Sequence, residues 1–140
     1  MNFVDSHTHL YLEEFGKDAD TSIQMALDAG VQKFIIPNVD SSTIQPMMQL
    51  CAKHPGTCFP ALGLHPGSVK ENYQEELKTI FSLFEKNRFI AIGEIGIDLY
   101  WDKTFFAQQV EVFEKQMLFA KAHDLPVIIH SRNSLNEIFH

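Results

Sequence analysis

Residues 106–130 read FAQQVEVFEKQMLFAKAHDLPVIIH, and two hydrophobic patterns follow one another within them. The first part carries apolar residues at the spacing of one helix face, namely Phe106, Val110, Phe113, Met117 and Ala120. An uninterrupted apolar run then occupies 126–129, which is typical of a strand buried on both faces. The pair predicts a long helix that leads into a strand of a parallel sheet, and His130 stands at the end of that strand.

The same alternation extends toward both ends of the chain. Short runs rich in apolar and β-branched residues are expected to form strands at about 2–5, 33–37, 58–62 and 89–92. Segments of helical period are expected to form helices at about 18–29, from Ser41 or Ser42 onward, around 77–84, and from Asn133 onward. Strands that alternate with helices in this way predict βα units and a parallel sheet.

Five strands and about four and a half helices indicate an α/β protein of one domain, 1–140. The expected architecture is a TIM (β/α)8-type barrel truncated to about five βα units, because a full barrel typically needs about 250 residues and this chain has 140. A doubly wound open sheet is the alternative. It is disfavoured because no glycine-rich phosphate loop follows the first strand, where His-Thr-His stands instead.

Composition excludes several classes of protein. The net charge of −7 is not that of a protein that holds nucleic acid mainly by neutralising phosphates. No run of about 18 apolar residues is present, so no membrane span is expected. The N-terminus lacks the basic and apolar regions of a secretory signal. With only two cysteines, Cys51 and Cys58, no disulfide framework is expected, and a cytoplasmic location is the default.

Polar side chains with metal-binding capacity follow four of the expected strands. His7 and His9 come after the first strand, His65 after the third and Glu94 after the fourth, while His130 ends the fifth. In barrel enzymes the active site lies at the C-terminal ends of the strands, so these side chains should converge.

Spacing and surroundings suggest metal binding for three of these residues. His7 and His9 are two positions apart and point the same way in an extended segment, so both could reach one ion. Glu94 stands at the end of an apolar strand, where a carboxylate is costly unless it is paired or coordinated, and it could bridge two divalent ions. Each could also be an ordinary polar residue of a loop or turn.

Other polar residues have less specific surroundings. His65 could touch a substrate phosphate or orient a ligand, and the planar fork of Arg132 suits phosphate oxygens. Asp5 and Asp98 could accept N–H groups from ligating histidines, although roles in caps or turns are about as common. Trp101 and its neighbour Tyr100 could stack a base, with packing of the loop as the alternative.

Four blocks of sequence resemble the TatD family of metal-dependent hydrolases. They are VDSHTHL at 4–10, GLHPG at 63–67, AIGEIGID at 91–98 and LPVIIHSR at 125–132, with Gln109, Phe113 and Gln116 between the last two. The resemblance implies a metal-dependent phosphodiesterase of the amidohydrolase superfamily with two divalent ions, zinc, manganese or magnesium. It implies that His7 and His9 bind the first ion and His130 the second, that the catalytic Glu94 bridges them, and that a water activated by the metals attacks phosphorus.

The resemblance also implies a class of substrate, and this sequence departs from the family pattern in its set of metal ligands. Members act as deoxyribonucleases, often from the 3′ end of single strands, and some act on D-aminoacyl-tRNA. The family's further ligands, a histidine after the sixth strand and an aspartate after the eighth, lie beyond this sequence. A C-terminal half or a second chain is therefore an expected partner besides DNA. The alternatives are an amide hydrolase of the same superfamily and a non-catalytic fragment that binds metal or a partner.

Overall fold

The computed structural model describes residues 2–139, apart from the side chains of residues 16 and 17. The strands are Phe3–Asp5 (β1), Val31–Pro37 (β2), Cys58–Ala61 (β3), Ile92–Asp98 (β4) and Val127–Arg132 (β5). The helices are Ala19–Asp28 (α1), Ser41–Lys53 (α2), Tyr73–Phe84 (α3), Phe106–Ala122 (α4) and Leu135–Phe139 (α5), with 3-10 helices at Glu13–Asp18 (η1) and Pro66–Ser68 (η2). An α-helix thus follows each strand, and the predicted alternation is confirmed.

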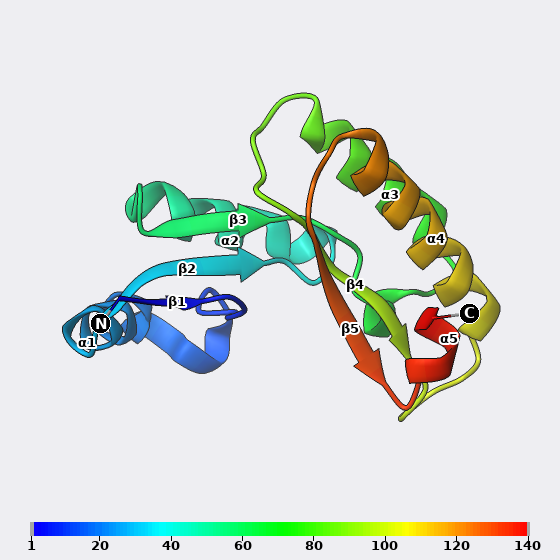
Figure 1. Cartoon of the computed structure of the whole chain (residues 1–140), viewed down its shortest axis with the longest axis horizontal. Coiled ribbons are helices and arrows are strands. Elements are labelled where there is room, and N and C mark those ends of the chain that lie inside the picture. Colours follow the sequence, from blue (N-terminus) through cyan, green and yellow to red (C-terminus); the bar gives the residue numbers. More distant parts are fainter. Residues whose placement is uncertain (1, 140) are drawn as a thin grey trace.

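The strands are parallel and lie in the order in which they occur in the chain. β1 pairs with β2 and β2 with β3, while β4 and β5 form a second sheet. A single parallel bridge between Leu62 and Ile92 joins the two sheets. The one sheet expected from the sequence is therefore divided here, and β4 and β5 run in a different direction from the other strands (Figure 1). A sequential order without reversal is that of a (β/α) barrel and excludes the doubly wound alternative.

The fourth strand lies further along the chain than predicted. The apolar run suggested 89–92, whereas β4 begins at Ile92 and ends at Asp98. The prediction was wrong because it ended the strand before Gly93, whereas Gly93 and Gly96 both lie inside it. A Cβ atom on Gly96 would lie 1.9 Å from the His130 carbonyl oxygen of β5. The glycine thus allows the two strands to approach closely.

Two other boundaries differ in ways that affect the site. β5 continues to Arg132, three residues beyond the predicted end, so His130 lies inside the strand and not at its end. The last helix begins at Leu135, two residues after Asn133. Asn133 has a φ of 53°, a left-handed conformation that is incompatible with a helical start.

Helices cover one side of the strands, and the main core lies beneath them. Phe34 and Ile36 of β2 are buried in one cluster with Met47 of α2 and Ile80 of α3. A second cluster joins β4 to α4, and α3 and α4 lie side by side (Figure 1). No helix among residues 2–139 is both long enough and apolar enough to cross a membrane.

Candidate metal centre

The structure brings five predicted residues together, although they come from four separate parts of the chain. His7 and His9 follow β1, and His65 is the N-cap of η2 after β3. Glu94 lies within β4 and His130 within β5, so the predictions that Glu94 follows its strand and that His130 ends its strand were wrong. All four histidines nevertheless lie within 4 Å of Glu94, which confirms that the side chains converge.

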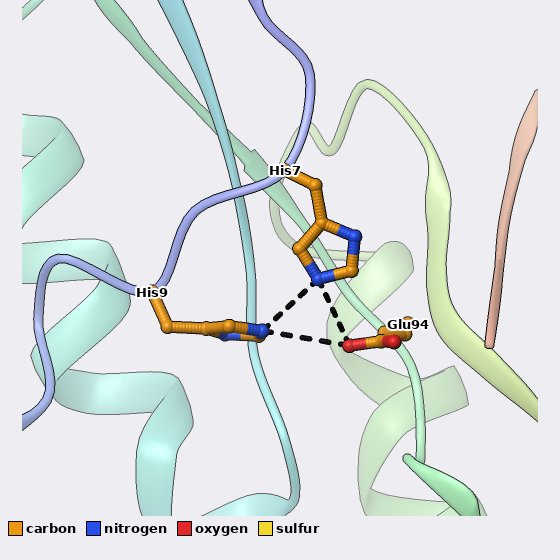
Figure 2. Close-up of side chains that lie close together, drawn as sticks. All are labelled: His7, His9 and Glu94. Atoms are coloured by element: carbon orange, nitrogen blue, oxygen red, sulfur yellow. Dashed lines mark hydrogen bonds and ion pairs between the residues drawn. The ribbon is translucent and has the colours of Figure 1, made fainter. Parts of the chain in front are cut away.

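The first cluster consists of His7, His9 and Glu94 (Figure 2). The Nε2 atoms of the two histidines lie 3.1 Å apart. Glu94 Oε2 lies 3.0 Å from His7 Nε2 and 3.4 Å from His9 Nε2. Ligand atoms about 2.0–2.1 Å from a metal ion are about 3.3 Å apart in a tetrahedron and about 3.0 Å apart in an octahedron. The three atoms therefore have the spacing of one face of a coordination sphere.

A hydrogen bond on the far side of His9 determines which ring nitrogen carries the proton. His9 Nδ1 lies 2.9 Å from the Pro37 carbonyl oxygen, to which the Tyr11 hydroxyl also donates at 2.8 Å. A carbonyl oxygen only accepts, so Nδ1 carries the proton and donates it. Nε2 then directs its lone pair toward His7 and Glu94, as a metal ligand requires.

The second cluster consists of His65, Glu94 and His130 and includes the other oxygen of Glu94. Glu94 Oε1 lies 2.9 Å from His130 Nδ1, and His130 Nε2 lies 2.9 Å from Asp98 Oδ2. An ionised Asp98 only accepts, so His130 Nε2–H donates to it and the ring is fixed in orientation. Asp98 thus occupies the accepting position expected of it, and His130 Nδ1 points at the shared carboxylate.

His65 belongs to the second cluster, but its hydrogen bonds differ from those of His9 and His130. Its Nε2 lies 3.2 Å from His130 Nδ1, a separation that also suits a ligand. Its Nδ1, however, accepts the backbone N–H of Gly67 at 3.0 Å. Burial lowers the pKa of His65 to about 4, so the ring is neutral at pH 7 and its proton is on Nε2. His65 therefore presents a donor to the site, which favours substrate contact over metal binding.

Glu94 is the charged residue around which the site is organised, and its side chain is almost completely buried. Burial alone raises the pKa of a carboxyl group, but its contacts with His130 and the other histidines of the site outweigh it. The pKa of Glu94 is therefore held well below its usual range, and the carboxylate is ionised. A buried ionised group in a cluster of this kind is characteristic of functional sites.

The remaining predicted residues lie at the edge of the cluster. Asp5, expected to accept an imidazole N–H, instead accepts the backbone N–H of His7 at 3.1 Å and so shapes the turn. For His9 the accepting role falls to the Pro37 carbonyl. The guanidinium of Arg132 lies 3.8 Å from the centre of the Tyr100 ring.

Two buried glutamines of α4, which were noted above only as part of the family resemblance, also support the site. Gln109 accepts the Asp98 N–H at 2.8 Å and donates to its carbonyl at 3.2 Å. Gln116 binds both backbone groups of Leu64 in the same way, at 2.7 and 3.2 Å. The helix thereby fixes the backbone of Asp98 and the residue before His65. The available signal was their place on the apolar face of α4, at the same spacing as Phe113.

The contacts of His130 give a first testable expectation. In the metal-free chain its hydrogen bond with Glu94 outweighs burial, and Asp98 adds to the effect, so the pKa of His130 is raised. Protonated His130 therefore stabilises the folded chain below pH about 6.5, its unfolded pKa, and this is lost as the pH rises through the folded pKa. Glu94→Gln should lower the pKa of His130, as measured by an NMR pH titration. Glu85→Gln, an exposed control, should not. An unchanged titration in Glu94→Gln would assign the shift to another cause.

Comparison with known proteins agrees with this architecture. The sequence profile of the family described as "TatD related DNase" matches residues 4–140. YjjV, an uncharacterised metal-dependent hydrolase of Escherichia coli, is 34% identical over 138 residues, which are 97% of this chain and 53% of YjjV. The 3′-5′ ssDNA/RNA exonuclease TatD of Erwinia tasmaniensis is 32% identical over 130 residues, 93% of this chain and 50% of that protein. The chain thus spans about half the length of these relatives.

A solved structure has the same fold as this chain. The crystal structure of YjjV matches with a TM-score of 0.87 at 33% identity, over 97% of this chain and 53% of that one. The parallel strands in sequential order are those of a TIM-type barrel. Because the family profile and these relatives cover nearly all of it, the chain belongs to the TatD family of metal-dependent hydrolases.

Proposed function

We propose that this chain forms part of a deoxyribonuclease that acts on single-stranded DNA from the 3′ end. The observation that carries the proposal is the position of Glu94, whose two oxygens face different histidine groups. One carboxylate that bridges two divalent ions is an arrangement suited to two-metal hydrolysis of phosphodiesters. The name of the Erwinia relative, a 3′-5′ ssDNA/RNA exonuclease, supports this substrate over the amide alternative.

The residues have distinct roles in this proposal. His7, His9 and Glu94 hold one ion, and Glu94 with His130 holds the other. Zinc, manganese and magnesium remain the candidates, because imidazole and carboxylate ligands suit all three to different degrees. When bound, such a pair would lower the pKa of a water molecule and offset negative charge on the phosphoryl group. His65 would donate from Nε2 to a phosphate oxygen.

We further propose that additional βα units, from a C-terminal segment or another chain, complete the barrel. Within the described residues β1 and β5 each pair on one side only, and Val4 and Ile129 on these strands are exposed. Ile90 and Ile128 line a cavity of about 330 Å³ near His7. The relatives are nearly twice as long as this chain. We place the reaction in the cytoplasm, with which the two free cysteines agree.

The test is hydrolysis of a 3′-labelled single-stranded oligonucleotide by the 140-residue chain. The reactions contain manganese or magnesium. The chain is assayed by itself and also after it is mixed with a purified C-terminal half of YjjV. Chelator-sensitive release of labelled mononucleotide, absent in Glu94→Ala and present in Glu85→Gln, is the expected result. A mixture that binds divalent metal and leaves every phosphodiester intact would overturn the proposal.

A further inference from the structure

The loop that follows β4 presents two large aromatic side chains to solvent. Trp101 is 78% exposed and Tyr100 is 49% exposed. Their rings meet edge to face, with centroids 4.6 Å apart. The backbone N–H of Tyr100 donates to Asp98 Oδ1 at 2.9 Å, so the carboxylate that holds His130 also anchors this loop. Exposed aromatic surface attached to a candidate metal centre indicates a binding surface.

Arg132 joins this pair from the neighbouring strand. Its guanidinium lies 3.8 Å from the centre of the Tyr100 ring and 5.5 Å from that of Trp101. It stands two residues after His130 in β5, and its partner in β4 is Asp98. Because side chains alternate along a strand, Arg132 and His130 share a face. The guanidinium makes no hydrogen bond or ion pair with the described part of the chain, which leaves its donors available to a phosphate.

A small cavity lies between this loop and η2. Its volume is about 140 Å³, and Gly67, Lys70, Asp98, Trp101 and Phe105 are among the residues that line it. Two of its lining residues contact histidines of the candidate metal centre. Gly67 donates to His65, and Asp98 accepts from His130. Asp98 and Asp102 outnumber Lys70 among the charged residues of the lining, which makes the cavity unfavourable for a phosphate. A flat, uncharged ring beside the aromatic side chains is the better match.

We infer that Trp101, Tyr100 and Arg132 form a stacking platform for one unpaired base of a nucleic-acid strand. The base stacks on the Trp101 indole over the cavity, and Arg132 binds the adjoining phosphate. This rests on the proposed function for the identity of the ligand and would account for the proposed action on single strands, since a base within a duplex is not free to stack in this way. Trp101 is thereby assigned as a specificity-determining residue beside the metal centre.

The test uses the fact that Trp101 is the only tryptophan of the chain. Its fluorescence is followed in the full chain, with chelator to prevent hydrolysis, while an eight-residue oligothymidylate is added. The comparison strand has the same number of phosphates but abasic sites throughout. Saturable quenching by the oligothymidylate, at an affinity about 10-fold higher than that of the abasic strand, is expected from base–aromatic stacking.

Variants are compared by the fluorescence anisotropy of labelled strands. Trp101→Ala should reduce affinity for the oligothymidylate about 10-fold and leave affinity for the abasic strand unchanged. Trp101→Phe should retain most of the preference for bases. Phe15→Ala, which removes an exposed aromatic ring in η1, should have no effect. Arg132→Gln should weaken binding of both strands by a similar factor, because it acts on a phosphate.

The results separate this inference from the proposed function. Equal affinity for the two strands, absence of quenching, or an emission typical of a buried indole would overturn the platform even if the chain hydrolyses DNA. Quenching that depends on the base, from a chain that hydrolyses no phosphodiester, would support the platform as a binding site and count against the nuclease.

Discussion

Glu94→Gln should abolish the binding of both divalent ions, not of one. Glu94 Oε2 lies at the His7 and His9 nitrogens, while Oε1 lies at His130 Nδ1, so one side chain belongs to both clusters. The substitution keeps the size of the side chain but replaces one oxygen by a nitrogen that donates hydrogen bonds and carries no negative charge. Loss of outer-shell partners alone costs about 10–100-fold in metal affinity, so loss of a shared ligand should exceed about 100-fold.

The measurement is titration calorimetry with manganese or zinc, and three variants make it specific. His9→Ala should remove only the ion of the first cluster and leave one ion bound. Asp98→Asn should leave both ions but weaken the second, because Asp98 contacts His130 and belongs to neither cluster. Glu85→Gln should match the unsubstituted chain. Two ions bound by Glu94→Gln at near-normal affinity would show that Glu94 does not bridge the sites, and circular dichroism would confirm that the variant is folded.

Local patterns were sufficient to predict much of this centre. His7 and His9 follow a strand at a spacing of two residues, and extended backbone then requires their side chains to point the same way. The convergence of Glu94 and His130 with them was expected from the common direction of parallel strands, although both residues lie inside their strands and not at the C-terminal ends. Both arguments depend only on chain direction and residue spacing, which the sequence contains.

The errors arose where the outcome depends on contacts that strand and helix patterns do not encode, either between two strands or within a short turn. Gly93 and Gly96 look like strand terminators in isolation, and only the closeness of β5 shows why glycine is needed inside β4. The protonation of His65 depends on the Gly67 N–H, so spacing alone could not separate a ligand from a donor. Asp5 has the residue type of an imidazole partner, but the turn after β1 directs it to the His7 backbone.

Gly96→Ala should destabilise the chain more than an ordinary glycine substitution does, and Gly56→Ala provides the matched control. Both glycines have positive φ, 148° at Gly96 and 77° at Gly56. Gly56 has no atom within 4 Å of an added Cβ, so its substitution costs only the backbone strain, about 1–2 kcal/mol. At Gly96 the added Cβ would lie 1.9 Å from the His130 carbonyl oxygen, a backbone atom that cannot rotate away.

Relief of that overlap requires β4 and β5 to move apart, and the consequences extend to the metal centre. The expected loss of unfolding free energy for Gly96→Ala is about 4 kcal/mol or more, the range of severe core substitutions. Urea unfolding of the two variants and the unsubstituted chain measures the difference. A Gly96→Ala chain that fails to fold while Gly56→Ala folds would agree with the expectation. Equal losses in the two variants would mean that strand spacing is not set at Gly96. The same strand spacing keeps Glu94 Oε1 2.9 Å from His130 Nδ1. Any folded Gly96→Ala chain should therefore bind the second ion more weakly than the unsubstituted chain does, with a smaller effect on the first ion.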